Sequence, residues 1–471
     1  MVGNSLFLNI TNPQLYTSGS KVEGIAQVLV KDRLNLEAVE VELFGLAKSK
    51  NYQYNNGVRL SGQESHKLLH ITNKVFPPPH VQNVAMSKSY TLTSGRYNYP
   101  FEFVFPGKEH VIQCVKDKKI LHKREYLWNE RRYHATLPGS FFDGVNLSDY
   151  CFVQYSVKAR VKMASSFRFN IKQSVPIYFA PRNSDSFFSL LSLCDASSKD
   201  LLPDESHACK KVKYAIDSDL KKNKSFLRSL FSSNAVEVPF DLNVRFKEVI
   251  PIETEKGTTN RVLQAGSRLS RFVDLDLSTS FSYSNLMDAL GMNKLDKRGS
   301  VPPPAIKFTH IEIKLLSTVR YQGTRESVLE SSFVLRKHPL ELQVDLSDFE
   351  KVENYSPLLS KKSPSKYSEK LDENVCYRLS LDRSWWDCYV SDIGQTFMLC
   401  NIHKTARLYI CLRIASAGNP AKERKIENTS PIVFYRQEGP DAPLYNQVEH
   451  LPRYMPAPAD YDDDSMTDEK G

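Results

Sequence analysis

Three tyrosines near the C-terminus each follow a proline at the same or nearly the same distance. The segments are Ala442-Pro443-Leu444-Tyr445, Leu451-Pro452-Arg453-Tyr454 and Pro458-Ala459-Asp460-Tyr461. Proline sets a polyproline II backbone at little entropic cost, so its ring and the nearby tyrosine can reach an aromatic groove and an adjoining pocket. The spacing predicts that a peptide-binding module recognises this tail through Leu451, Pro452, Tyr454, Pro443, Tyr445, Pro458 and Tyr461.

A second candidate is the basic segment 110–134, which holds seven lysines and arginines against three acids, a net charge of +4. Each basic residue gains about 1 kcal/mol at an anionic membrane surface, so the segment favours weak membrane or phosphate binding. A solvated loop without a partner is the alternative, and a similar basic run occupies 210–228. The candidate contacts are Lys116, Lys118, Lys119, Lys123, Arg124, Arg131 and Arg132.

Charge is divided unevenly along the 471 residues. The chain as a whole carries +9, whereas residues 437–471 hold nine acids and two bases, which leaves +16 on the rest. A body this basic is attracted to polyanions, either nucleic acid or the anionic face of a membrane. Nucleic-acid binding is disfavoured because no recognisable module is present and the basic runs contain few aromatic residues.

The elements that position these segments follow a two-residue period, typical of half-buried β-strands. Apolar residues alternate with polar ones in 39–43, 101–105, 151–163, 236–246, 306–319 and 408–414. Stretches with a helical period are scarce, and no βαβ pattern is visible. The sequence therefore predicts an all-β fold of two tandem antiparallel sandwiches.

The breaks in this alternation divide the chain into four parts. We expect a first sandwich over 1–180, a basic interdomain connection over 181–235, a second sandwich over 236–436 and a disordered acidic tail over 437–471. Long loops are expected at 254–301 and 356–372, and part of 212–231 fits either a basic amphipathic helix or a solvated linker. The tail holds five prolines and too few aliphatic residues to offset the entropy of ordering.

Other features exclude several classes of protein. No apolar run approaches the ~18 residues of a membrane span, and the N-terminus lacks a signal-peptide pattern, so we expect a cytoplasmic protein. The eight cysteines include no Cys-x-x-Cys pair, which argues against disulfides. Nucleotide, zinc-protease and esterase motifs are absent, and the spacing of Cys400 and His403 alone is weak support for a metal. We therefore expect no enzyme activity, metal or cofactor, and we expect Trp385 and Trp386 to fill the second core or its edge.

Several short motifs in order resemble the arrestin superfamily, and specifically the α-arrestins, the fungal arrestin-related trafficking adaptors. They are Tyr16-x-x-Gly19, Val22-x-Gly24, Leu43-x-Gly45, the YPFEFVFP strand at 99–106 and LPGSF at 137–141. The resemblance covers roughly residues 5–180 and is weaker over 236–436. We expect these glycines and phenylalanines to have structural roles in turns, close contacts and the core.

The resemblance implies a function for the tail. The proline-tyrosine segments are similar to the PPxY ligands that α-arrestins present to WW domains of HECT-type ubiquitin ligases; Leu451–Tyr454 is the LPxY variant, and each of the other two lacks one proline. The family implies an adaptor that links plasma-membrane transporters to such a ligase, promotes their ubiquitylation and endocytosis, and is recruited peripherally to plasma membrane or endosomes. Two alternatives stay open: a ligase-independent sorting scaffold, and a β-sandwich hydrolase or carbohydrate-active enzyme.

Overall fold

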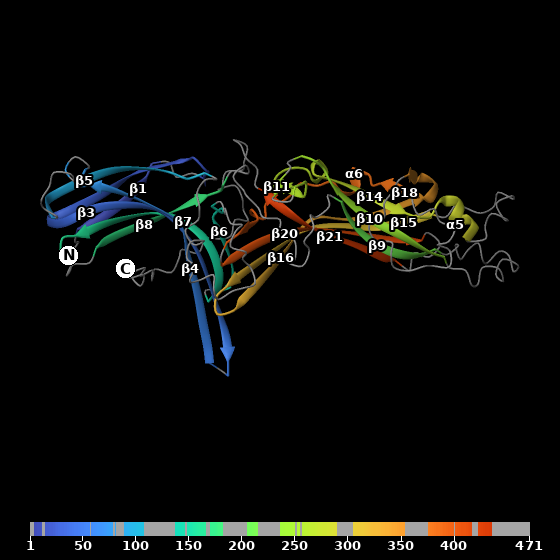
Figure 1. Ribbon diagram of the computed structural model, residues 1–471, viewed down its shortest axis with the longest axis horizontal. Helices are drawn as coiled ribbons and strands as arrows, with labels where there is room; N and C mark the ends of the chain where they lie inside the picture. Colours follow the sequence, from blue (N-terminus) through green and yellow to red (C-terminus); the bar gives the residue numbers. More distant parts are fainter. Residues whose placement is uncertain are drawn as a thin grey trace.

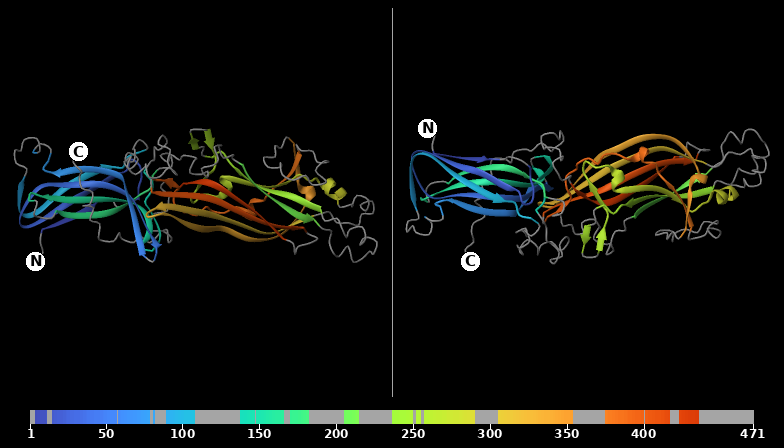
Figure 2. Two further views of the ribbon diagram at one scale, coloured as in Figure 1. Left: turned by 60° about the horizontal axis from the view of Figure 1, so that its bottom comes forward. Right: turned by 90° about the horizontal axis from the view of Figure 1, so that it is seen from above.

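The computed structural model has two elongated β-sandwiches arranged end to end (Figure 1), and the two turned views show the same arrangement (Figure 2). It describes residues 4–11, 15–56, 58–78, 81, 89–107, 137–146, 148–165, 170–181, 205–214, 236–249, 252–254, 257–289, 305–353, 375–399, 401–416 and 423–435. Strands dominate these residues and nearly all neighbouring strands are antiparallel. The expected all-β fold with tandem sandwiches is confirmed.

The first sandwich is built around one very long strand, β3. Its first half pairs with β1 and β5, and its second half pairs with β4 and β7, so β3 runs through both layers. The strands are β1 (Ser5–Ile10), β2 (Leu15–Tyr16), β3 (Lys21–Asn55), β4 (Val58–Phe76), β5 (Tyr90–Val104), β6 (Phe141–Asn146), β7 (Asp149–Met163) and β8 (Ile171–Phe179).

The change of layer along β3 is visible in its buried residues. Before residue 37 the buried side chains have even numbers, as at Leu34 and Leu36, and after it the completely buried ones, at 0% exposure, have odd numbers, as at Val39 and Val41. The pairing with β7 shifts by one residue between Leu36 and Ala38. Because successive side chains of a strand alternate in face, one extra residue moves the apolar set to the other face and bends the strand.

The motif glycines of this sandwich have the structural roles expected of them. Gly19 has φ of +81°, a conformation that costs a residue with a Cβ atom about 1 kcal/mol or more. A Cβ atom at Gly24 would lie 2.4 Å from the carbonyl oxygen of Asn9 and 2.5 Å from Cζ of Phe101. The close approach of three strands at this point therefore requires glycine.

Beyond the body, β3 and β4 continue as a two-stranded arm, seen as the blue hairpin that projects downward in Figure 1. The rings of Tyr52 and Tyr54 contact edge to face there, with centroids 5.7 Å apart. Tyr54, Val58 and Leu60 are exposed near the tip. No acidic residue occurs between Lys48 and Gln63, so the arm is basic as well as partly apolar.

The second sandwich packs a five-stranded sheet, β17-β18-β14-β10-β9, against a six-stranded sheet with the main order β13-β21-β20-β15-β16. Its strands are β9 (Glu205–Tyr214), β10 (Val236–Phe246), β11 (Ile252–Thr254), β12 (Gly257–Thr259), β13 (Val262–Gln264), β14 (Val273–Thr279), β15 (Ala305–Gln322), β16 (Glu326–Asp345), β17 (Glu350–Glu353), β18 (Val375–Ser380), β19 (Phe397–Met398), β20 (Ile402–Ser416) and β21 (Arg424–Tyr435). Two short α-helices, α5 (Tyr283–Ala289) and α6 (Arg383–Trp386), and two 3-10 turns, η4 (Leu269–Arg271) and η6 (Leu346–Asp348), complete it.

Two sequence expectations differ from this structure. Residues 205–214, expected within the interdomain connection, form β9 and pair with β10 along ten residues. Residues 257–289, expected in a long loop, contain β12, β13, β14 and α5, and β14 lies in the middle of the five-stranded sheet. In β14 six of seven residues are buried, so this short strand lacks the polar alternation that would have revealed it.

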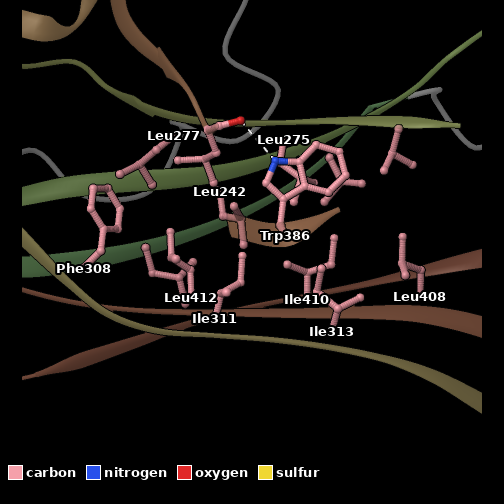
Figure 3. Close-up of a cluster of buried hydrophobic side chains, with 14 of the residues drawn as sticks. Leu242, Leu275, Leu277, Phe308, Ile311, Ile313, Trp386, Leu408, Ile410 and Leu412 are labelled. Carbon is pink, nitrogen blue, oxygen red and sulfur yellow. Dashed lines mark hydrogen bonds between the residues drawn. The ribbon is translucent and has the colours of Figure 1, made fainter. Parts of the chain in front are cut away.

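Trp386 fills the second core, as predicted. Its side chain is 1% exposed and lies between the two sheets, near Leu275 and Ile410 (Figure 3). The indole Nε1 donates a hydrogen bond to the carbonyl oxygen of Leu381 at 3.1 Å, so the buried polar group is satisfied. A hydrogen bond from the Ser384 backbone to Asp382 caps α6 and holds the tryptophan in place.

Candidate functional site

The residues predicted to bind partners lie outside the described part of the chain. This holds for the proline-tyrosine segments between 442 and 461, for the basic segment 110–134 and for the whole tail 437–471. Their roles stay predictions. Among the described residues, the most extensive polar site is the junction between the two sandwiches.

At this junction the turn between β15 and β16 lies against β3, with Asn51 at the centre. Asn51 is fully buried and its Oδ1 accepts a hydrogen bond from the backbone N–H of Thr324 at 2.7 Å. Its Nδ2 donates to the carbonyl oxygen of Arg325 at 2.6 Å and to Oγ of Ser327 at 2.9 Å. One side chain of the first sandwich therefore bonds to three residues of the second, two in the turn and one at the start of β16.

The turn and the arm approach each other without room for side chains. A Cβ atom at Gly62 of β4 would lie 2.2 Å from the backbone nitrogen of Thr324, and one at Gly323 would lie 2.3 Å from Oδ1 of Asn51. Glycine at both positions is what allows the hydrogen bonds of Asn51 to form.

Further polar contacts extend the junction. Ser49 Oγ donates to the carbonyl oxygen of Gln322, and Asn401 Nδ2 donates to Ser49 Oγ at 3.1 Å. The hydroxyl of Tyr321 donates to Oδ1 of Asp149, and burial together with this carboxylate raises the pKa of Tyr321 far above its ordinary value. The tyrosine is thus a permanent hydrogen-bond donor at accessible pH.

Apolar contacts make the junction continuous with the first core. Side chains of the second sandwich that pack into this core include Val319, Tyr321, Phe397, Leu399 and Ile402. The rings of Phe141 and Phe397 meet edge to face with centroids 5.3 Å apart, and Lys404 Nζ lies 4.7 Å from the centroid of the Phe141 ring. Because buried surface and hydrogen bonds are both shared, the two sandwiches are held in one fixed arrangement.

The outer face of the first sandwich carries a network of charged side chains. Arg160 donates to Glu40 at 2.9 Å and to Glu42 at 3.3 Å, and Lys162 lies 2.8 Å from Glu40. Burial alone would raise the pKa of Glu40, but the hydrogen bonds from Lys162 and Arg160 outweigh it and the pKa is lowered. The hydrogen bond from His70, opposed by burial, lowers the pKa of Glu42. Both carboxyl groups therefore stay ionised, which is unsuitable for a general acid.

The described residues show little of the chemistry needed for metal binding or thiol reactions. They contain no group of three or more His, Cys, Asp or Glu side chains that could hold a metal ion. Five cysteines in the described ranges are free, and burial raises the pKa of the Cys151 thiol well above its usual value. Burial and the neighbouring Arg320 lower the pKa of His403 to about 4, while Cys400 lies outside the described residues.

Sequence reasoning missed the junction residues. Asn51 and Arg325 are 274 positions apart, and neither belongs to a motif. The one available signal was the glycine at each contact, Gly62 and Gly323, and a single glycine does not identify its neighbour.

None of the helices in the described residues has the length and apolar character needed to span a bilayer.

Comparison with known proteins accounts for the first sandwich. The model of the arrestin (or S-antigen) N-terminal domain matches residues 6–178, which are almost the bounds of β1 to β8. Arrestin-related trafficking adapter 10 of Saccharomyces cerevisiae (strain ATCC 204508 / S288c) is 28% identical over 178 residues, covering 33% of this chain and 33% of the relative. Its namesake from Lachancea thermotolerans is 26% identical over 174 residues, covering 32% and 39%.

The aligned region thus spans only about a third of the length of these curated relatives. The matched domain belongs to a non-enzymatic family, so for residues 6–178 the match favours the expectation of no enzyme activity over the hydrolase alternative. The motifs, the eight-stranded first sandwich and the matched bounds agree. Residues 6–178 are therefore an arrestin N-terminal domain, and through that domain the chain is a distant homologue of the fungal arrestin-related trafficking adapters.

Proposed function

We propose that this protein is a non-enzymatic adaptor that links plasma-membrane transporters to a WW-domain HECT-type ubiquitin ligase and so promotes their ubiquitylation and endocytosis. The observation that carries the proposal is the arrestin N-terminal domain of residues 6–178, related to trafficking adapters. The fixed arrangement of the two sandwiches supports a gripping role, because a rigid platform loses little entropy when it binds a cytosolic segment of a transporter.

Ligase recruitment is assigned to the tail. Its best segment is Leu451–Tyr454, and the outer two, ending at Tyr445 and Tyr461, supply further low-affinity sites. Such ligases carry several WW modules, and a tether raises the effective concentration of a second site to about millimolar. Several weak contacts on one tail would then bind more tightly together than any one of them alone.

The test is a pull-down of the full chain with the tandem WW modules of a HECT ligase. Replacing Tyr445, Tyr454 and Tyr461 by alanine should abolish capture, and Tyr454→Ala alone should weaken it most among the single variants. Pro456→Ala, which changes a tail proline outside the three segments, is the matched control. Unchanged capture by the triple variant would remove the ligase role and leave a ligase-independent sorting scaffold.

Membrane recruitment is assigned to the basic segment 110–134. Its net charge of +4 corresponds to about 4 kcal/mol at an anionic surface, which is only millimolar-scale affinity. Membrane contact would therefore assist binding to a transporter without replacing it, and would hold the cytoplasmic protein at plasma membrane or endosomes.

Sedimentation with phosphatidylserine vesicles tests this role. Neutralising Lys116, Lys118, Lys119, Lys123, Arg124, Arg131 and Arg132 should lower binding to the level seen with uncharged vesicles, and full binding by that variant would contradict the assignment.

A further inference from the structure

The second sandwich ends in a long strand, β16, that has a partner on one side only among the described residues. β15 pairs with it from Glu326 to Asp345, interrupted at two register shifts, and the sheet stops there. Figure 1 shows β16 along the lower margin of the second body. A strand in this position presents every second N–H and C=O group to another strand.

The first half of β16 lacks the lysine and proline that commonly protect an edge. Residues 326–335, ESVLESSFVL, contain two glutamates but no proline, lysine or arginine, whereas Arg336, Lys337, His338 and Pro339 follow directly. Val328, Phe333 and Val334 are 50%, 39% and 55% exposed. Apolar side chains exposed along an open edge are unusual unless another chain covers them.

The types of residue in the stretch 328–334 follow the same order in both directions from its centre. Counting outward from Ser331, polar residues come first (Glu330, Ser332), then large apolar ones (Leu329, Phe333), and then two valines (Val328, Val334). The regular pairing with β15 covers this whole stretch and breaks just after it, since Leu335 lies opposite no residue of β15.

The two faces of the strand agree with the same symmetry. Leu329 and Phe333 lie opposite the buried Val319 and Leu315, so both belong to the inner face of the sheet. Val328 and Val334 lie opposite Arg320 and Lys314, on the outer face. If two copies of the strand pair symmetrically about Ser331, inner-face residues therefore lie opposite inner-face residues and outer-face residues opposite outer-face residues.

We propose that β16 is a homodimer interface, at which residues 328–334 of two copies pair antiparallel about a two-fold axis through Ser331. Leu329 of each copy then lies against Phe333 of the other, Val328 against Val334, and Glu330 against Ser332, so no like charges are directly opposed. A two-fold interface repeats each contact, as an isologous dimer requires. The sheet would continue from one copy into the other.

The register predicts a specific cross-link. Directly opposite residues have Cβ atoms about 4.5–5.5 Å apart, close to the span of a disulfide, so Ser331→Cys should give a covalent dimer when the full chain is treated with diamide as the oxidant. Glu326→Cys is the control, because its two copies would lie ten residues out of register, about 34 Å apart. The wild-type chain, which retains exposed Cys209, sets the background.

A second measurement does not depend on a disulfide. Val334→Lys places a charge on the outer face, as natural edges do, and should weaken the dimer at least tenfold in sedimentation equilibrium. Val104→Lys, at a similarly exposed valine of the first sandwich, should leave the dissociation constant unchanged. Circular dichroism verifies that each variant is folded.

Two results would overturn the proposal. One is a wild-type chain that stays monomeric up to about millimolar concentration while Ser331→Cys does not cross-link, which would leave the edge for an extended segment of a different partner. The other is equal cross-linking at positions 326 and 331, which would show association in another geometry.

Discussion

Replacing Asn51 by alanine is the most direct test of how the two sandwiches are joined. The side chain is fully buried and makes hydrogen bonds to Thr324, Arg325 and Ser327, in the turn of the other sandwich and at the start of β16. Asn51→Ala removes all three and leaves no group that can replace them. The backbone groups of the turn would then have to form hydrogen bonds with water, or the turn would have to shift away from β3.

The size of the effect follows from these contacts. A typical intramolecular hydrogen bond contributes about 1 kcal/mol net, so three give about 3 kcal/mol. Thr324 and Arg325 are exposed residues, and water would compensate part of their loss. We therefore expect the free energy of unfolding to fall by about 2–3 kcal/mol.

Urea unfolding of the full chain, followed by far-ultraviolet circular dichroism, measures this change. The control is Asn98→Ala, which removes an exposed asparagine bonded to Gln27 at 2.8 Å and should cost less than about 0.5 kcal/mol. If Asn51→Ala lowers the free energy of unfolding by no more than Asn98→Ala does, the junction is not held by Asn51, and the argument for a fixed arrangement fails.

Three further predictions concern packing and pH. Gly62→Ala should destabilise the chain by about 1–3 kcal/mol, because its Cβ atom would collide with Thr324, whereas Gly107→Ala, with no atom within 4 Å, should be close to neutral by thermal unfolding. Trp386→Ala should cost about 3–5 kcal/mol in urea unfolding, and a loss below 1 kcal/mol would contradict the core position of this side chain. His403 has a folded-state pKa of about 4 against an ordinary 6.5, so the unfolded chain takes up the proton first as pH falls. The contribution of neutral His403 to the free energy of unfolding is therefore complete above about pH 6.5 and declines toward pH 4, by up to about 3 kcal/mol. His403→Gln should flatten the stability profile over that window, and an unchanged profile would refute the assignment.

Much of the fold was predictable because burial has a short-range signature. The alternation of Val39, Val41 and Leu43 identified a strand whose three side chains are all fully buried. Phe101 and Phe103 were identified in the same way. A strand with one buried face needs no information beyond its own residues, since successive side chains point to opposite faces.

β9 was missed because an edge strand carries weak signals. It lies at the end of the five-stranded sheet, and among the residues 205–212 only Val212 is buried. Its lysines, Lys210, Lys211 and Lys213, suggested a solvated connection. Such polar residues are what an edge strand tolerates, so composition alone favours a loop and only pairing with β10 reveals the strand.

The sequence by itself determined the all-β class, segments of several long strands and the motifs that mark the arrestin N-terminal domain, because each depends on neighbours along the chain. The tertiary structure alone decided that Asn51 holds a turn more than 270 positions away, and that β16 is the last strand of its sheet among the described residues. Contacts between distant segments depend on how whole sheets are placed, and a residue such as asparagine or serine looks the same in sequence whether water or a buried carbonyl group is its partner.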